Sequence, residues 1–497
     1  MGSDATKPNN KLAAVLTKFP PELRPAVLTA IRVFVLGWSV TTAPATLSIL
    51  ITALIKAVKK PSSLPHVASK AFLRDLPSQL QRSVLQNGLP YLLAGAFAGH
   101  RFLAYAIKKQ QQQQQQRSSS SNEKENEDKN MDPRVNEFLT AALAMIAVRR
   151  AFPRTKTLDF TFFALVRALD VVAHRAYSSP VARQYLPDWS LEYGSVIVFT
   201  LACTEIMFAW FFAPQRLPRS YSMWITKMSE MDERLLIALR AIRDGKWIYG
   251  KDTGIQDLLG GLCEDLGLPR ELGDPLIGRI PCLVVHQGQP YGCEVHSITR
   301  FIRGFIKVFP LYFAVHFAPR LLFRTSSVLN NPSTQLFHTL KSTMRSSAFL
   351  ASFIAIIWYA ICLTRTRIGH QLLGMDQTRL DNTLAPFIGC ALCGLSLLIE
   401  SRHRRGEMAL YVVPRALYSL TERVLGPYQR GRWWEPVAAE AAETLVFASS
   451  ITVVLDAMFK DQSTVRSSVR SLLSWILKDE LKANEQEQQQ QNGKPSC

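Results

Sequence analysis

The chain of 497 residues is poor in acidic side chains and in charge overall. It has 39 Asp and Glu against 58 Lys and Arg, only 20% of its residues are charged, and its formal net charge is +19. It also lacks a Ser-His-Asp order, a nucleotide-binding glycine loop and an HExxH motif. These absences argue against the common hydrolases and nucleotide-dependent enzymes, and we expect a non-enzymatic protein without an obligatory cofactor.

Cysteine is sparse and irregularly placed. The eight cysteines occur inside apolar runs as well as in polar segments, which is unlike the disulfide framework of a secreted domain. The first 26 residues are polar and proline-rich, so a cleavable signal peptide is not expected.

What the chain does contain is apolar runs of bilayer length, within a sequence that is 47% hydrophobic. A spanning helix needs about 20 mostly apolar residues, and little in the sequence favours strands, whose open edges cannot sit in lipid. The clearest runs are 194–213, 347–363 and 382–399. The sequence therefore predicts an all-α, polytopic helical membrane protein with the lipid bilayer as its main partner.

The excess of positive charge is explained by the same expectation. Basic residues flank the apolar runs, and Arg402, Arg404 and Arg405 follow directly on the run 382–399. Such clusters are attracted to anionic headgroups. We expect these three arginines to contact lipid headgroups, and we expect no nucleic-acid partner.

Changes in composition divide the chain. Gln110–Gln116 is a glutamine tract within a polar stretch that cannot form a core. Residues 220–250 and 464–480 have the apolar spacing of amphipathic helices. The expected segments are a disordered arm 1–26, membrane-associated helices 27–107, a disordered linker 108–134, membrane helices with an amphipathic helix 135–250, a polar extramembrane segment 251–299, a second helical membrane half 300–460, and an amphipathic helix with a disordered tail 461–497.

Short echoes suggest that the two membrane halves are related. Leu89-Pro90-Tyr91-Leu92 resembles Phe309-Pro310-Leu311-Tyr312, and two further pairs follow in the same order, as in an internal repeat. Separately, Gly95 and Gly99 have the four-residue spacing that lets two helices approach closely.

A Cys/His cluster precedes the run that begins near residue 300. Cys282, His286, Cys293 and His296 offer four ligands suited to tetrahedral zinc, with glycines and a proline to tighten the loop between them. Their spacing differs from that of zinc fingers. A Cys282–Cys293 disulfide and an ordinary polar turn are open alternatives.

Three polar residues lie in or near apolar helices. Asp170 and His174 are four residues apart and share a helix face, and Glu205 lies inside the run 194–213. Charges in such places are costly and usually face a partner or a wet cavity. We predict intramembrane polar sites here, either an ion or proton path or paired interior groups.

Three blocks of sequence resemble the transmembrane protein 135 family, and together they cover about residues 280–425. The first is Cys282–Leu322, with its Cys/His cluster and its basic-to-apolar helix. The second is Ala348–Phe353 with the glycine-bearing run 388–396, and the third is Glu400 with Arg404-Arg405-Gly406 and Tyr411.

The resemblance implies a multi-span protein of the peroxisomal or mitochondrial membrane that acts in organelle organisation or in lipid or metabolite handling without catalysis. It also implies a distant likeness to the helical bundle of the mitochondrial inner-membrane translocase superfamily. It supplies no catalytic residues. A lipid or metabolite transporter or channel, a metal-dependent membrane enzyme using the Cys/His cluster, and a scaffold for homo-oligomers or organelle-membrane partners are the alternatives.

Overall fold

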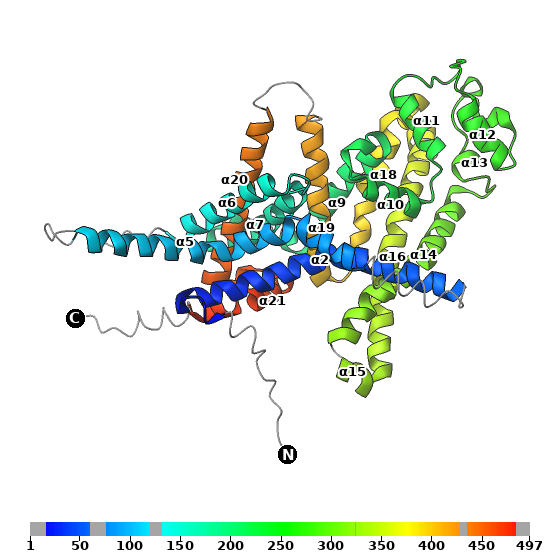
Figure 1. Ribbon diagram of the computed structural model, residues 1–497. Helices are drawn as coiled ribbons and strands as arrows, with labels where there is room; N and C mark the ends of the chain where they lie inside the picture. Colours follow the sequence, from blue (N-terminus) through cyan, green and yellow to red (C-terminus); the bar gives the residue numbers. More distant parts are fainter. Residues whose placement is uncertain are drawn as a thin grey trace. The chain divides into compact units, whose positions relative to one another are not determined.

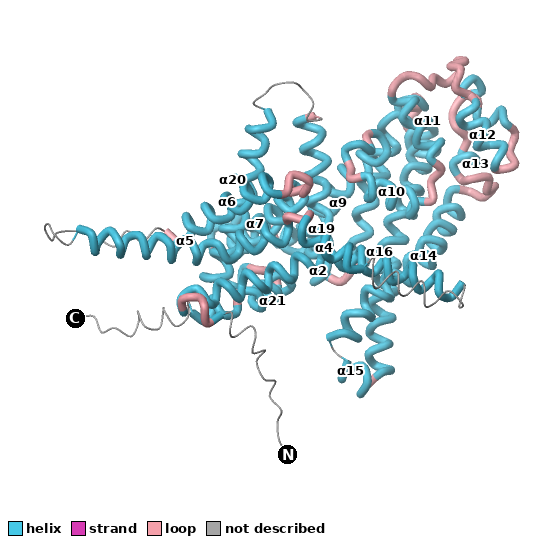
Figure 2. Tube along the Cα trace, viewed as in Figure 1, coloured by secondary structure: helices cyan, strands magenta, loops and turns pink. Residues whose placement is uncertain are grey.

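The computed structural model describes residues 16–59, 76–118, 132–185, 187–323, 325–426 and 435–483. Every regular element in these ranges is a helix, and no strand occurs among them (Figure 2). The prediction of an all-α fold is confirmed. Parts of the expected N-terminal arm, linker and tail, namely 1–15, 119–131 and 484–497, lie outside the described residues.

Six helical segments in the described part of the chain are long and apolar enough to cross a membrane. They are Pro21–Ala43, Glu192–Phe212, Cys293–Leu321, Pro332–Leu372, Gln377–Ile399 and Pro436–Lys460. Their lengths suit the hydrocarbon core of a bilayer. They support an integral, polytopic membrane protein.

The chain divides into two compact units that do not follow the expected order of two consecutive halves. Unit 1 comprises residues 1–185 and 430–497, and unit 2 comprises 186–429. The C-terminal helix α20 (Glu435–Lys460) packs against α6 (Pro133–Ala151) and α7 (Leu158–Ser178), because its buried residues Phe447, Leu455 and Met458 share one apolar cluster with residues of those helices. A relationship between two halves of the sequence stays a prediction.

Unit 1 is a helical bundle in which the long α2 packs against α4, α5 and α21. In chain order its further elements are η1 (Pro21–Leu23), α2 (Arg24–Lys59), α4 (Leu76–Leu85), α5 (Leu89–Ser118), α8 (Pro180–Tyr185), η10 (Gln462–Thr464) and α21 (Ser467–Ile476). Helix α5 runs through the glutamine tract to Ser118, past the boundary expected at residue 108. Glutamine is a good helix former, and adding turns to an existing helix needs no new nucleus.

Glycines set the contact between α5 and α6, as their spacing predicts. A Cβ at Gly95 would lie 2.9 Å from the Cβ of Ala144, and one at Gly99 would lie 3.1 Å from the Cβ of Thr140. Real Cβ contacts are rarely this short, so the two helices approach more closely than side chains would permit. The prediction for these two glycines is confirmed.

Unit 2 contains the long helices α9, α14, α16 and α19, with a segment of short helices between α11 and α14 that the sequence predicts to be extramembrane. Its elements are α9 (Asp188–Phe212), η4 (Pro214–Arg216), α10 (Arg219–Ser229), α11 (Glu233–Arg243), α12 (Asp257–Asp265), η5 (Arg270–Gly273), η6 (Pro275–Ile277), α13 (Cys282–Val285), α14 (Cys293–Phe323), α15 (Thr325–Asn330), α16 (Pro332–Leu363), η7 (Thr364–Leu372), α17 (Gln377–Arg379), η8 (Leu380–Leu384), α18 (Ala385–Cys393), η9 (Gly394–Ile399) and α19 (Arg402–Leu425). The amphipathic stretch expected over 220–250 forms two helices, α10 and α11, because the chain turns at Glu230 with a φ of 50°.

Helices α14 and α16 lie side by side in unit 2, joined by the short α15 (Figure 1). The outward face of α14 is apolar. Ile298, Ile302 and Ile306 recur at four-residue spacing and are 59%, 50% and 66% exposed. A continuous stripe of this kind is unfavourable in water and favourable against acyl chains, which fits α14 as a lipid-facing span.

The close contact of α5 with α6 predicts that alanine at Gly95 will destabilise unit 1. The added methyl should cost about 1–3 kcal/mol by overpacking, since it meets a Cβ rather than the flexible end of a side chain. Thermal unfolding of the detergent-solubilised protein measures the effect. Gly194→Ala on α9 is the matched control, because a Cβ there meets nothing within 4 Å and alanine favours the helix. Equal shifts in both variants would contradict the close contact.

Candidate functional site

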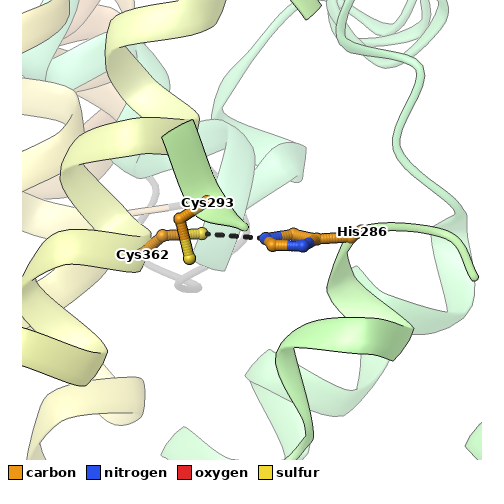
Figure 3. Close-up of side chains that lie close together, drawn as sticks. All are labelled: His286, Cys293 and Cys362. Atoms are coloured by element: carbon orange, nitrogen blue, oxygen red, sulfur yellow. Dashed lines mark hydrogen bonds between the residues drawn. The ribbon is translucent and has the colours of Figure 1, made fainter. Parts of the chain in front are cut away.

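Three ligand-type side chains from three elements of unit 2 converge at one end of its helices. His286 follows α13, Cys293 begins α14, and Cys362 lies in the last turn of α16. One donor atom from each lies within 4.8 Å of the other two. Figure 3 shows the imidazole directed at the two sulfurs. Both His286 and Cys362 are almost fully buried, at 2% and 1% exposure.

The hydrogen bonds of His286 orient its ring. Its Nδ1 lies 3.3 Å from the carbonyl oxygen of Tyr291, so Nδ1–H donates to that oxygen. The lone pair is then on Nε2, which lies 3.6 Å from the Cys362 Sγ (Figure 3). A backbone carbonyl that fixes the tautomer in this way is typical of metal-binding histidines.

The four residues predicted from sequence are brought together only in part. Cys282 lies within hydrogen-bonding reach of Cys293, and both are free thiols. Burial, more than any other cause, raises the pKa of the Cys282 thiol. Cys293 and His286 therefore form one group, to which the structure adds Cys362, while Cys282 lies beside Cys293 but outside the three donors that are within 4.8 Å of one another.

His296 lies behind this group. Its ring stacks on His286 with centroids 4.1 Å apart. The Nε2 of His296 accepts a hydrogen bond from Arg300 Nε at 3.3 Å, and Arg300 also donates to the Ser229 carbonyl oxygen. The geometry thus gives His296 the role of packing against His286 rather than facing the sulfurs.

A buried ion pair lies one turn beyond Cys362. Arg365 and Asp381 are 7% and 0% exposed and are joined by two hydrogen bonds, one of them 2.9 Å long. Tyr249 donates its hydroxyl to the same carboxylate at 2.6 Å, and burial followed by the Asp381 charge raises the pKa of Tyr249. The pair ties the extramembrane segment to the helix ends, since Arg365 also donates to the Ile280 carbonyl oxygen. It lies where α16 widens into the π-helical stretch η7, a local geometry that often marks functional sites.

The opposite end of α14 and α16 carries a basic pocket. This cavity of about 160 Å³ has four cationic side chains in its wall and a single carboxylate. Its lining residues are Arg320, His338, Lys341, Ser342, Arg345, Glu400, Ser401, His403 and Arg404. Lys341 and Arg345 are exposed, and neither forms an ion pair with any described residue. The pocket is therefore positively charged.

Glu400 anchors the wall of the basic pocket. It is 1% exposed, accepts a hydrogen bond from Ser346 Oγ at 2.6 Å and pairs with Arg404 at 2.9 Å. Arg404 also donates to Ser346 Oγ at 3.1 Å. Arg320 is held from the other side by Thr339 Oγ1 at 2.7 Å.

The three arginines expected at lipid headgroups have different surroundings. Arg404 lines the basic pocket. Arg405 instead donates to the carbonyl oxygens of Glu400 and Leu398, which satisfies the last turn of η9. Arg402 is exposed and pairs with Glu192.

The two ends are separated by about one bilayer. Arg320 comes 27 residues after Cys293, which is about 40 Å along a helix. The hydrocarbon core and headgroups together measure about 40–45 Å. The distance between the Cys/His group and the basic pocket along this helix pair therefore matches the thickness of a bilayer.

The predicted intramembrane acids are paired. Asp170 accepts from Arg466 Nε at 2.8 and 2.9 Å, and His174 lies 3.5 Å from the same carboxylate. Both are on α7, which is not among the six candidate spans of the described chain. Glu205 lies within a candidate span and accepts hydrogen bonds from Ser419 and Arg423 of α19. The paired-group alternative is the one that this geometry favours.

Unit 1 holds a second buried carboxylate network. Asp456 pairs with Arg134 at 2.8 Å, Arg175 at 3.2 Å and Lys460 at 2.8 Å. Glu137 lies nearby, 4% exposed. Burial first, and the Asp456 charge second, raise the pKa of Glu137 to about 8.

The sequence missed Cys362 and most of the basic pocket. Cys362 is 76 residues from His286 and lies inside an apolar run, where a thiol normally indicates packing. Lys341 and Arg345 stand before the same run. The signal that could have found them is the antiparallel pairing of α14 with α16, which places the end of one helix beside the start of the other.

The raised pKa of Glu137 predicts a pH-dependent stability of unit 1. Between its ordinary pKa of 4.5 and about 8, the folded state keeps a proton that the unfolded state has lost, so the free energy of unfolding falls as pH rises. Glu137→Gln should flatten this fall and should be more stable than the parent above pH 8. Thermal unfolding from pH 5 to 9 measures it, with Glu233→Gln, an exposed glutamate of α11, as control. An unchanged slope in Glu137→Gln would refute the assignment.

Comparison with known proteins adds no family to this geometry. No protein-family profile, no curated protein and no solved structure matches the chain.

Proposed function

We propose that this chain is a non-catalytic integral membrane protein that binds the phosphate of anionic lipids, in organelle organisation or lipid handling. The observation that carries the proposal is the basic pocket. It lies beside the ends of three apolar spans, where a headgroup would meet it, and its four cations face one buried carboxylate. Each basic residue near a membrane surface contributes about 1 kcal/mol to attraction of anionic lipid.

The pocket combines two fixed cations with two exposed ones, which suits it to bind a phosphate. Arg320 and Arg404 are held in place by Thr339 and Ser346, so they are pre-organised donors. Lys341 and Arg345 are exposed and can close on a ligand. Arginine binds phosphate through two parallel N–H groups, and lysine binds it as a point charge.

The sequence resemblance to the transmembrane protein 135 family supports placing this activity in a peroxisomal or mitochondrial membrane. Transport is the second candidate, and it has less support. An ion path needs acids that can release their partners, whereas Asp170 and Glu205 are each held by an arginine. Metal-dependent catalysis also has less support, because the carboxylate of Glu294, which follows Cys293 in the chain, pairs with Arg367.

Lipid binding is tested with the double variant Lys341→Ala/Arg345→Ala of the full chain in uncharged detergent. Native mass spectrometry measures the apparent affinity for phosphatidic acid, with phosphatidylcholine as the neutral comparison. Loss of two cations should weaken phosphatidic acid binding about tenfold or more. The fold should persist, because neither side chain forms a hydrogen bond or ion pair with a described residue.

The matched control is Lys246→Ala/Lys251→Ala, which removes the same charge from exposed lysines outside the pocket. Its affinity for phosphatidic acid should stay near that of the parent chain. Glycerol phosphate and inorganic phosphate are added as competitors, because displacement of the lipid by them would indicate a soluble phosphorylated metabolite as ligand. Equal weakening in both double variants, or no preference over phosphatidylcholine, would exclude the pocket as the site.

The organelle is tested by imaging the tagged full chain against peroxisomal and mitochondrial membrane markers. Coincidence with either marker is the expected result. Exclusive residence in the plasma membrane or the endoplasmic reticulum would reject the organelle assignment, while leaving the pocket experiment unaffected.

A further inference from the structure

We infer that Cys282, His286, Cys293 and Cys362 form a closed structural zinc site that fastens the extramembrane segment to the ends of α14 and α16. The inference does not depend on lipid binding, because its residues lie at the other end of these helices. Four ligands of the Cys₃His type are a common set for structural zinc.

The distances between the donor atoms suit zinc. Tetrahedral zinc holds sulfur at about 2.3 Å and nitrogen at about 2.0–2.1 Å, so a bound sulfur and a bound nitrogen lie about 3.5 Å apart. The Cys362 Sγ and His286 Nε2 are separated by 3.6 Å. The donors of His286, Cys293 and Cys362 all lie within 4.8 Å of one another. The group needs only a small contraction to bind zinc.

The tautomer of His286 and the free thiols of the cysteines also suit metal binding. His286 presents the lone pair of Nε2 to the sulfurs because its Nδ1–H is bound to the Tyr291 carbonyl oxygen. Stacking on His296 holds the ring in this orientation. All three cysteines are free thiols, and each would release its proton on binding the metal.

Cys282 is the candidate for the fourth ligand. It lies beside Cys293 and is half-buried. Its sulfur is outside the group of three donors that lie within 4.8 Å of one another, so it would have to move toward them to bind the metal. His296 is unsuitable, because its Nε2 already accepts from Arg300. The site therefore uses Cys362 where the sequence alone suggested His296.

A bound metal would also cross-link separate elements of unit 2. Cys282 and His286 belong to the extramembrane segment, Cys293 to the start of α14 and Cys362 to the end of α16. A metal bound by all four cross-links residues that are up to 80 positions apart. Because no ligand position remains for water, the site would be structural rather than catalytic.

The test is metal analysis of the full chain, purified in detergent without chelators. Inductively coupled plasma mass spectrometry should find about one zinc per chain, and Cys293→Ser and Cys362→Ser should each lose most of it. Cys263→Ser is the matched control, since Cys263 is a buried free thiol of α12 outside the group. His296→Phe, which keeps an aromatic ring against His286 but offers no ligand, should keep its zinc. This variant separates the present ligand set from the one suggested by sequence.

A second measurement covers variants that fail to fold. The parent chain, stripped with a chelator and given Co²⁺, should show the thiolate charge-transfer band and the intense d–d bands of a tetrahedral site, and added Zn²⁺ should abolish both. Absence of stoichiometric metal together with no cobalt spectrum would overturn the inference. So would a Cys282–Cys293 disulfide, detected by thiol labelling under denaturing, non-reducing conditions.

Discussion

The antiparallel packing of α14 against α16 is the contact on which both sites of unit 2 depend. It places Cys362 beside Cys293 at one end and Thr339 beside Arg320 at the other. Midway, a Cβ at Gly304 would lie 3.6 Å from the Cα of Ala351, so small residues let the two backbones come close. Lipid gives little hydrophobic drive for helices to associate, which makes such close packing and the polar contacts at the ends decisive.

The cost of burying charge explains how polar groups are distributed in both units. An unpaired ion away from water is expensive, and the buried acids of the described chain are matched with cations accordingly. Asp381 has Arg365, Glu205 has Arg423, and Asp456 has three basic partners. Glu137 is the instructive exception. Its burial, and after that the nearby charge of Asp456, raise its pKa to about 8, so it retains its proton near neutral pH.

The sequence predicted the class of fold because apolar periodicity and run length are local properties. It also predicted the Gly95 and Gly99 contact, since helix spacing alone puts both glycines on one face. It could not predict that α20 would complete unit 1, or that Cys362 would join His286, because these depend on which helices pair. The break between α10 and α11 at Glu230 was missed for a local reason, since a glutamate at positive φ leaves no signal in composition.

The ion pairs of the structure also show which basic residues of unit 2 have partners and which do not. Along the sequence, basic residues flank apolar runs at both ends, and they appear evenly spread. In the structure several cations at the Cys/His end have partners: Arg365 pairs with Asp381, Arg367 pairs with Glu294, and Arg300 donates to backbone carbonyl oxygens. At the other end Lys341 and Arg345 line the basic pocket without an ion pair among the described residues. Two unpaired cations of unit 2 thus lie in one pocket together with Arg320 and Arg404, and this grouping is what suits that end of the helices to phosphate.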